Sequence, residues 1–219
     1  MPASQRNGAS HRIAIDFIDP LFAVVISISF VEGMQRPWFK APSTAILADS
    51  AFDMVVLLLG YSTVVLSWVG YHLSIRGSPT RIEILPGFLR FIFDTVLLGC
   101  YWLLLVKFES FLFILIMLVI IHWVFVVWDQ LKWWEYNDQD TTGSRRRRGV
   151  SVFWAIIFTI LLLIYWKIET GSASSDTVNW VFVGLGHFST IIYRVHKNYL
   201  WPGAILDILA FHAPIREVS

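Results

Sequence analysis

Six long apolar stretches, each bounded by polar or charged residues, dominate this sequence. A helix that crosses a membrane needs roughly 20 mostly apolar residues, with about 17 tolerated. Hydrophobic residues make up 56% of the chain and charged residues 15%, against about a quarter charged in an average soluble domain. The sequence therefore predicts an all-α, polytopic integral membrane helix bundle. The six predicted transmembrane helices are Ile13 to Met34, Ala51 to Ile75, Leu85 to Val106, Phe111 to Trp128, Val150 to Trp166 and Val178 to Val195.

The distribution of basic residues predicts the orientation of these spans. With six spans, one side of the membrane holds all of the 17 lysines and arginines except Arg36, Lys40, Lys107 and Lys167. Because cytoplasmic loops carry an excess of basic residues, this asymmetry predicts that both termini are cytoplasmic, with the chain in a cell membrane or inner membrane. The sixth stretch contains Asn179 and His187, so five spans remain an alternative, although a weaker charge asymmetry would result.

The predicted membrane domain, residues 11–198, lies between two different terminal segments. Residues 1–10 are small and polar and predict a flexible N-terminal tail. Residues 129–149 predict a cytoplasmic loop that ends in Arg145 to Arg148, a cluster attracted to anionic lipid by about 1 kcal/mol per residue. Residues 199–219 predict an amphipathic C-terminal segment on the membrane surface.

The first span carries acidic side chains close to its start. A carboxylate in hydrocarbon costs several kcal/mol unless it is paired or hydrated, so such groups normally face a bundle interior or an aqueous path. At about 100° per residue, the polar positions share one sector of the helix. That sector holds Arg12, Asp16, Asp19, Ala23, Ser27 and Phe30. For Asp16 the simpler alternative is a charge at the helix N-terminus, where acids favourably meet the helix dipole.

Partners for these acids are predicted on the second and third spans. Trp68 and His72 are four residues apart, so they share one helix face. Because the second span returns to the side where the first begins, His72 reaches the depth of Asp19; an interfacial belt of Trp, Tyr and His is the alternative. Asp94 of the third span lies at a similar depth, and Arg90, one turn earlier, is its simplest partner.

The sequence contains no motif for nucleophilic hydrolysis, no phosphate-binding loop and no closely spaced metal ligands. Cys100 is the single cysteine and lies within an apolar stretch, where cysteine acts as a small apolar residue. His122 and His187 are predicted to be packing residues. The sequence predicts no cofactor, no metal and no nucleic acid partner, and its net charge of +1 by itself says nothing about nucleic acid.

The first 100 residues resemble the lysosomal and bacterial potassium channels of the transmembrane protein 175 type. That family has R-x-x-x-F-S-D and a G-x-F-A-I-A-like run in its first helix, W-x-x-H-H in its second and an asparagine in its third. Here the first stretch is R-I-A-I-D-F-I-D-P-L-F-A-V-V-I-S and the second is W-V-G-Y-H, with Asp94 at the asparagine position. Ile18 replaces the serine, Pro20 a glycine and Tyr71 the first histidine.

The resemblance implies a tetramer of six-span subunits that conducts monovalent cations, chiefly potassium, with the first helices around a central pore. It implies that the first three helices are held together by a helix-clasp network of Arg12, Asp19, Trp68, His72 and Asp94. It also implies a pore constriction at Val24, followed by Ser27 and Val31 on the same side of the helix. An apolar constriction gates by dewetting.

Two other functions are compatible with the same residues. The first is an integral-membrane enzyme, acting on a lipid, that uses Asp16, Asp19, Asp94 and His72 as an acid/base or metal cluster. The second is a non-catalytic membrane scaffold that docks a partner through the aromatic stretch Trp133 to Tyr136.

Overall fold

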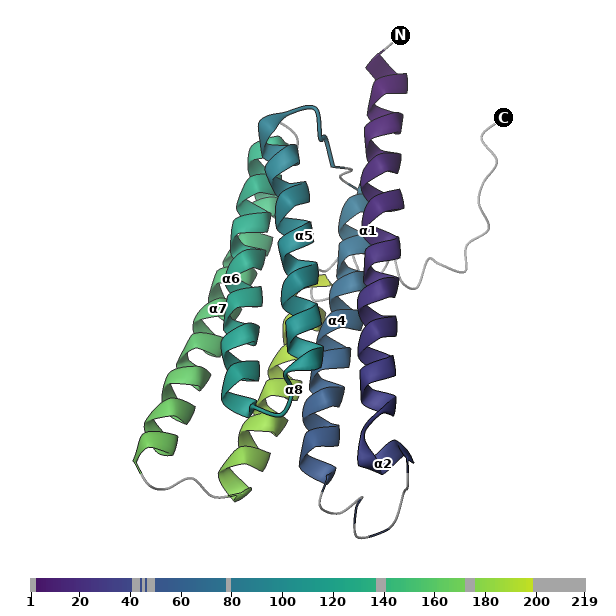
Figure 1. The fold of residues 1–219 in the computed structure, drawn as a ribbon. Helices are drawn as coiled ribbons and strands as arrows, with labels where there is room; N and C mark the ends of the chain where they lie inside the picture. The colour runs from purple at the N-terminus through teal and green to yellow at the C-terminus, as the bar shows by residue number, and fades with distance from the viewer. Residues whose placement is uncertain are drawn as a thin grey trace, which may run out of the picture.

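Every regular element among the described residues is an α-helix (Figure 1). The structure, a computed structural model, describes residues 3–40, 44, 46, 50–77, 80–136, 141–171 and 176–198. The helices are α1 (Ala3–Met34), α2 (Pro37–Lys40), α4 (Ala51–Gly77), α5 (Leu85–Val106), α6 (Phe111–Glu135), α7 (Thr141–Thr170) and α8 (Asp176–Asn198). The all-α prediction is therefore confirmed for this part of the chain.

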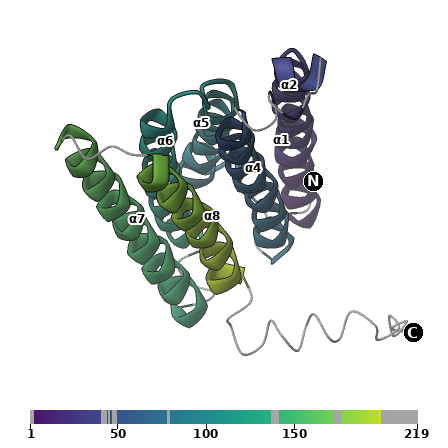
Figure 2. The same ribbon diagram turned by 90° about the horizontal axis from the view of Figure 1, so that it is seen from below.

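Five of the long helices close into a ring, and α1 lies outside it (Figure 2). Around the ring, α5 packs on α6, α6 on α7, α7 on α8, α8 on α4, and α4 on α5. Helix α1 packs chiefly on α5. The ring interior is filled by side chains that solvent barely reaches, among them Tyr101, Leu104, Ile121 and Tyr193.

The turn between α5 and α6 is as tight as the sequence predicts. Only residues 107–110 separate the two helices, which pack against each other as an antiparallel hairpin. The Ser110 hydroxyl accepts a hydrogen bond from the Phe113 backbone N–H at 3.4 Å, an N-cap that contributes about 1 kcal/mol to helix stability. Phe108, inside the turn, is 2% exposed.

Two glycines allow helices of the ring to approach closely. A Cβ atom on Gly186 of α8 would lie 3.1 Å from Leu59 of α4, and one on Gly60 of α4 would lie 2.9 Å from Leu105 of α5. Small residues at such contacts allow the dense packing that drives helix association in lipid. Gly184, two residues before Gly186, has nothing within 4 Å, so only one of the two α8 glycines serves this contact.

Four of the described helices are long and apolar enough to cross a membrane, which makes the chain a helical membrane protein. They contain Ala51–Ser74, Leu85–Val106, Phe111–Glu135 and Arg148–Thr170. The apolar stretch described in α1 is shorter, Phe17–Val31, and α8 is not among the four. Six spans with both termini on one side therefore stay a prediction.

The boundaries of two predicted segments differ in the structure. Helix α1 begins at Ala3, within the predicted N-terminal tail and well before the apolar part of the helix. Helix α6 continues to Glu135 and α7 begins at Thr141, so much of the predicted loop 129–149 is helical. The predicted C-terminal segment 199–219 lies outside the described residues.

Candidate functional site

Asp19 of α1 and His72 of α4 are brought together, as the sequence predicts. The His72 Nε2 atom lies 3.1 Å from the Asp19 Oδ2 atom, and His72 Nδ1 lies 3.1 Å from the Trp68 carbonyl oxygen. Both neighbours are acceptors, so the ring donates to both only when each of its nitrogens carries a hydrogen. The Trp68 ring lies 4.7 Å from the His72 ring, centroid to centroid. The contact between Asp19 and His72 joins α1 to the ring.

Asp94 lies in a different set of contacts. Its Oδ1 atom accepts a hydrogen bond from Trp128 Nε1 at 2.7 Å, and within the described part of the chain no hydrogen bond joins it to Asp19. Arg90 instead forms an ion pair with Glu135, in which both side chains are fully buried. The expected Arg90–Asp94 pair is thus replaced by a longer-range one, because the last turn of α6 brings Glu135 beside α5.

The remaining charges of the predicted network lie where side chains are not described. Arg12 and Asp16 belong to the helical backbone of α1, but their side chains are outside the described part of the structure. Of the predicted cluster of Asp16, Asp19, Asp94 and His72, the last three side chains are described, and among them only Asp19 and His72 are in contact. Among the described residues, no group of three or more His, Cys, Asp or Glu side chains is placed to hold a metal ion.

Helix α1 has two distinct faces. Ile18, Phe22 and Val25 are buried, at 0%, 5% and 9% exposure. The residues of the predicted pore face lie on the opposite side of the helix at about 100° per residue, and all of them are exposed. These residues are Val24, Ser27 and Val31.

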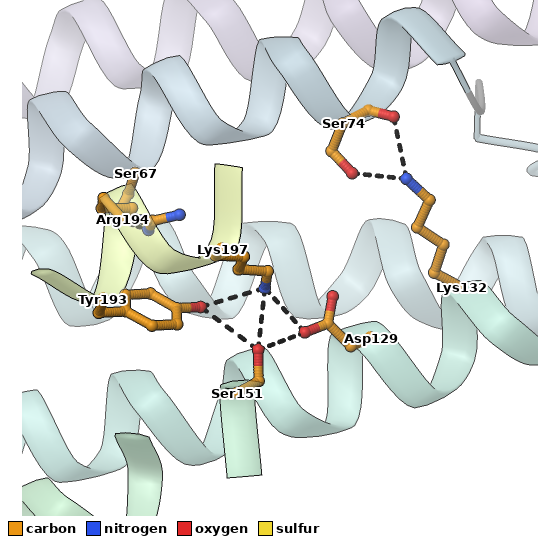
Figure 3. A network of polar contacts seen from close by, with 8 residues as sticks. All are labelled: Ser67, Ser74, Asp129, Lys132, Ser151, Tyr193, Arg194 and Lys197. Carbon is orange, nitrogen blue, oxygen red and sulfur yellow. Dashed lines mark hydrogen bonds and ion pairs between the residues drawn. The ribbon is translucent and has the colours of Figure 1, made fainter. Parts of the chain in front are cut away.

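The ring interior holds a polar cluster that the sequence did not indicate (Figure 3). The Lys197 ammonium of α8 donates to Asp129 of α6 at 2.7 Å, to Ser151 of α7 at 3.0 Å and to Tyr193 at 3.1 Å. Ser151 in turn donates to the same Asp129 oxygen. Three helices are thus joined by one buried ion pair and its hydrogen bonds.

Arg194 lies beside this cluster, and its described neighbours are a hydroxyl and aromatic rings. Its guanidinium donates to the Ser67 hydroxyl of α4 at 2.5 Å and lies 4.6 Å from the centre of the Phe125 ring. The Arg194 residue is 6% exposed, yet among the described residues no carboxylate lies within ion-pair distance of it. A desolvated cation–aromatic contact contributes about 2 kcal/mol, whereas burying an ion costs several kcal/mol.

A third cation approaches the same end of the ring. Lys132 of α6 donates to the backbone carbonyl and the hydroxyl of Ser74 in α4, at 2.9 and 2.6 Å. This contact links two helices that face each other across the ring. In the sequence, Lys132, Arg194 and Lys197 count only among the basic residues that predict the membrane orientation. The one sequence signal for this cluster is the spacing of Arg194 and Lys197, because residues three apart on a helix lie on the same face.

His122 and His187 both contact neighbouring side chains or backbone within the bundle. His122 is 1% exposed and stacks on Phe158 with ring centroids 3.9 Å apart. Its Nδ1 atom lies 2.7 Å from the Leu118 carbonyl oxygen, and His187 Nε2 lies 3.1 Å from the Val55 carbonyl oxygen. Each ring thereby has a backbone partner.

The aromatic stretch proposed as a docking surface is partly covered by arginines. The Arg148 guanidinium lies 4.4 Å from the centre of the Trp133 ring, and the Arg81 guanidinium lies 4.6 Å from that of Tyr136. Trp134 remains 60% exposed.

The chain was compared with protein-family models, with curated proteins and with solved structures, and no match was found in any of the three comparisons.

Proposed function

We propose that this chain is a subunit of a cation channel, selective for potassium, whose pore is lined by α1 at the axis of a homo-oligomer. The observation that carries the proposal is the two-sided character of α1. One face packs on the ring, while the opposite face, which holds Val24, Ser27 and Val31, is uncovered. A second copy of the same face can cover it without displacing any intrachain contact.

An axis between subunits is favoured over a path within one subunit. The interior of the ring is occupied by bulky side chains such as Tyr101 and Tyr193, each 1% exposed. It also contains Arg194 and Lys197, which repel a permeating cation. A symmetric oligomer supplies several copies of α1 around one axis, and the resemblance to the potassium channel family suggests four.

In this arrangement the residues of α1 divide into two roles. Asp19 lies on the side that meets His72 and holds α1 in place. Val24 forms the narrowest apolar ring and Ser27, about one turn further along, a polar ring. A ring of valine side chains without polar partners disfavours water and closes the path by dewetting. In this proposal α1 and α8 are the first and sixth spans and both termini are cytoplasmic.

Ion flux through reconstituted protein tests the conduction. Liposomes with a potassium gradient should show flux that depends on the protein, and potassium should pass faster than sodium. Val24→Ala widens the apolar ring and should raise the flux several-fold, while Ser27→Ala should change the potassium-to-sodium ratio. Val65→Ala is the matched control, because Val65 of α4 is 45% exposed but outside α1. Absence of flux from a folded oligomer would overturn the proposal.

Cross-linking tests where α1 lies. In a Cys100→Ala chain, Val24→Cys or Val31→Cys should form intersubunit disulfides under mild oxidation, because residues at a symmetry axis meet their own copies. Ile160→Cys is the control, since Ile160 of α7 is exposed to a similar degree, 45% against 49% for Val24. If Ile160→Cys cross-links and the two α1 variants do not, α1 is not at the axis.

A further inference from the structure

The run of four arginines lies within a helix, directly before its apolar part. Helix α7 begins at Thr141, and the part of it that is long and apolar enough to cross a membrane begins at Arg148. Arg145 is three residues earlier, about 5 Å along the helix axis. The headgroup layer on each side of the hydrocarbon is about 5–7 Å thick. The arginine run is therefore placed at the depth of the lipid headgroups.

The last arginine of the run contacts α6. The Arg148 guanidinium donates a hydrogen bond to the Gln130 side chain at 2.9 Å and lies 4.4 Å from the centre of the Trp133 ring. Successive positions on a helix are about 100° apart, so the arginines before Arg148 occupy other sides of α7.

Two of these arginines continue the outward side of α7. Phe153 and Ile156 on that side are 51% and 45% exposed, as expected of side chains that face lipid. Arg146 is seven residues before Phe153, and Arg145 is eleven residues before Ile156. Both spacings bring the helix back to within about 20° of the same direction. Arg145 and Arg146 thus occupy positions where the lipid-facing side of α7 reaches the membrane surface.

An exposed tryptophan lies at the same end of the neighbouring helix. Trp134 of α6 is 60% exposed, and it follows two other exposed residues, Trp123 and Val127, by eleven and seven positions. The Trp123 Nε1 atom donates to the Thr159 hydroxyl of α7 at 3.2 Å, so this side of α6 borders α7. Tryptophan rings favour the headgroup level of a membrane.

We propose that Arg145 and Arg146, with Trp134, bind the headgroup of an anionic phospholipid on the outer surface of the α6–α7 pair. Residues 136–149 contain four arginines and two aspartates, so the segment has a positive net charge. A guanidinium binds two phosphate oxygens at once, and the exposed Phe153 and Ile156 offer an apolar surface to the acyl chains. The site does not rest on the proposed pore, because neither α6 nor α7 lines it.

Native mass spectrometry of the purified full chain tests the site by counting bound lipids. The probes are phosphatidylglycerol and phosphatidylcholine with identical acyl chains. Phosphatidylglycerol should reach half-saturation at a concentration about ten-fold lower, because each basic residue near the surface attracts anionic lipid. Glycerophosphoglycerol, the same headgroup without acyl chains, should not displace the bound lipid. Equal half-saturation for the two lipids would overturn the proposal, and displacement by glycerophosphoglycerol would overturn it in favour of a soluble anion.

Substitutions place the binding on α7. The double change Arg145→Gln and Arg146→Gln should weaken phosphatidylglycerol binding about ten-fold and leave phosphatidylcholine binding unchanged, whereas lysine at both positions should preserve the preference. The matched control is the double change Lys107→Gln and Lys167→Gln, which removes two exposed cations at the opposite end of the bundle. A preference that survives the glutamine changes, or that the control reduces equally, would contradict the assignment.

Discussion

At the scale of single residues, two arginine–glutamate pairs differ in how much solvent reaches them. Arg90 and Glu135 have side chains at 0% exposure, whereas Arg36 and Glu109 are 29% and 63% exposed. Removing one partner of a buried pair leaves an uncompensated charge in a low dielectric. An exposed pair loses little, because water replaces the partner.

Glu135→Gln should therefore lower the free energy of unfolding by about 3 kcal/mol. The matched change Glu109→Gln should cost less than about 1 kcal/mol. Denaturation in mixed detergent micelles, followed by tryptophan fluorescence, measures both values. Equal losses for the two variants would mean that Glu135 is as hydrated as Glu109.

The contact between Asp19 and His72 is predicted to hold α1 against the ring. Both side chains are about one third exposed, at 34% and 28%, so a coupling energy of about 1 kcal/mol is expected. A double-mutant cycle with Asp19→Asn and His72→Gln measures it from the same unfolding assay. Additive effects of the two changes would show that the pair contributes no coupling. The proposed channel further predicts that Asp19→Asn impairs assembly of the oligomer.

At the scale of helices, the two glycines of α8 differ in their surroundings. A Cβ atom on Gly186 would lie 3.1 Å from the Leu59 side chain of α4, whereas a Cβ atom on Gly184 would have nothing within 4 Å. Gly186→Val should destabilise the bundle by about 1–3 kcal/mol more than Gly184→Val, because overpacking forces side chains out of their rotamers. The comparison cancels the intrinsic helix propensity of valine, since both positions are on one helix. Equal unfolding midpoints for the two variants would rule out a close α4–α8 contact.

The ends of helices were less predictable than their apolar parts. Helix α6 extends seven residues past the predicted end at Trp128, and Asp129, Leu131 and Glu135 in this extension are buried. Charged residues after an apolar run normally indicate a loop at the membrane surface. Here the extension stays helical because its two acids form ion pairs with neighbouring helices. Asp129 pairs with Lys197 of α8, and Glu135 pairs with Arg90 of α5.

At the scale of the whole molecule, the number of spans decides where the termini lie. With six spans, epitope tags at the N-terminus and the C-terminus should both be protected from an impermeant protease in right-side-out vesicles. A tag placed in the α5–α6 turn, at Glu109, should be cleaved in the same vesicles and serves as the accessibility control. Cleavage of one terminal tag and protection of the other would indicate an odd number of spans.

The sequence by itself determined the helical class of the chain and the tight α5–α6 hairpin, and it predicted similar depths for Asp19 and His72 while leaving an interfacial belt as the alternative. These features depend on the length of apolar runs, on the few residues between them and on the depth at which each span carries a polar group. All three can be counted along the chain.

Only the tertiary structure decided which charges pair across the ring. Arg90 was assigned to Asp94, four residues away, but pairs with Glu135, 45 residues away, and Lys197 pairs with Asp129, 68 residues away. Helix α6 is apolar around most of its circumference, so its sequence does not reveal which side faces α5 and which faces α8. The order and rotation of helices in the ring determine those faces, and they result from side-chain packing among all the helices at once.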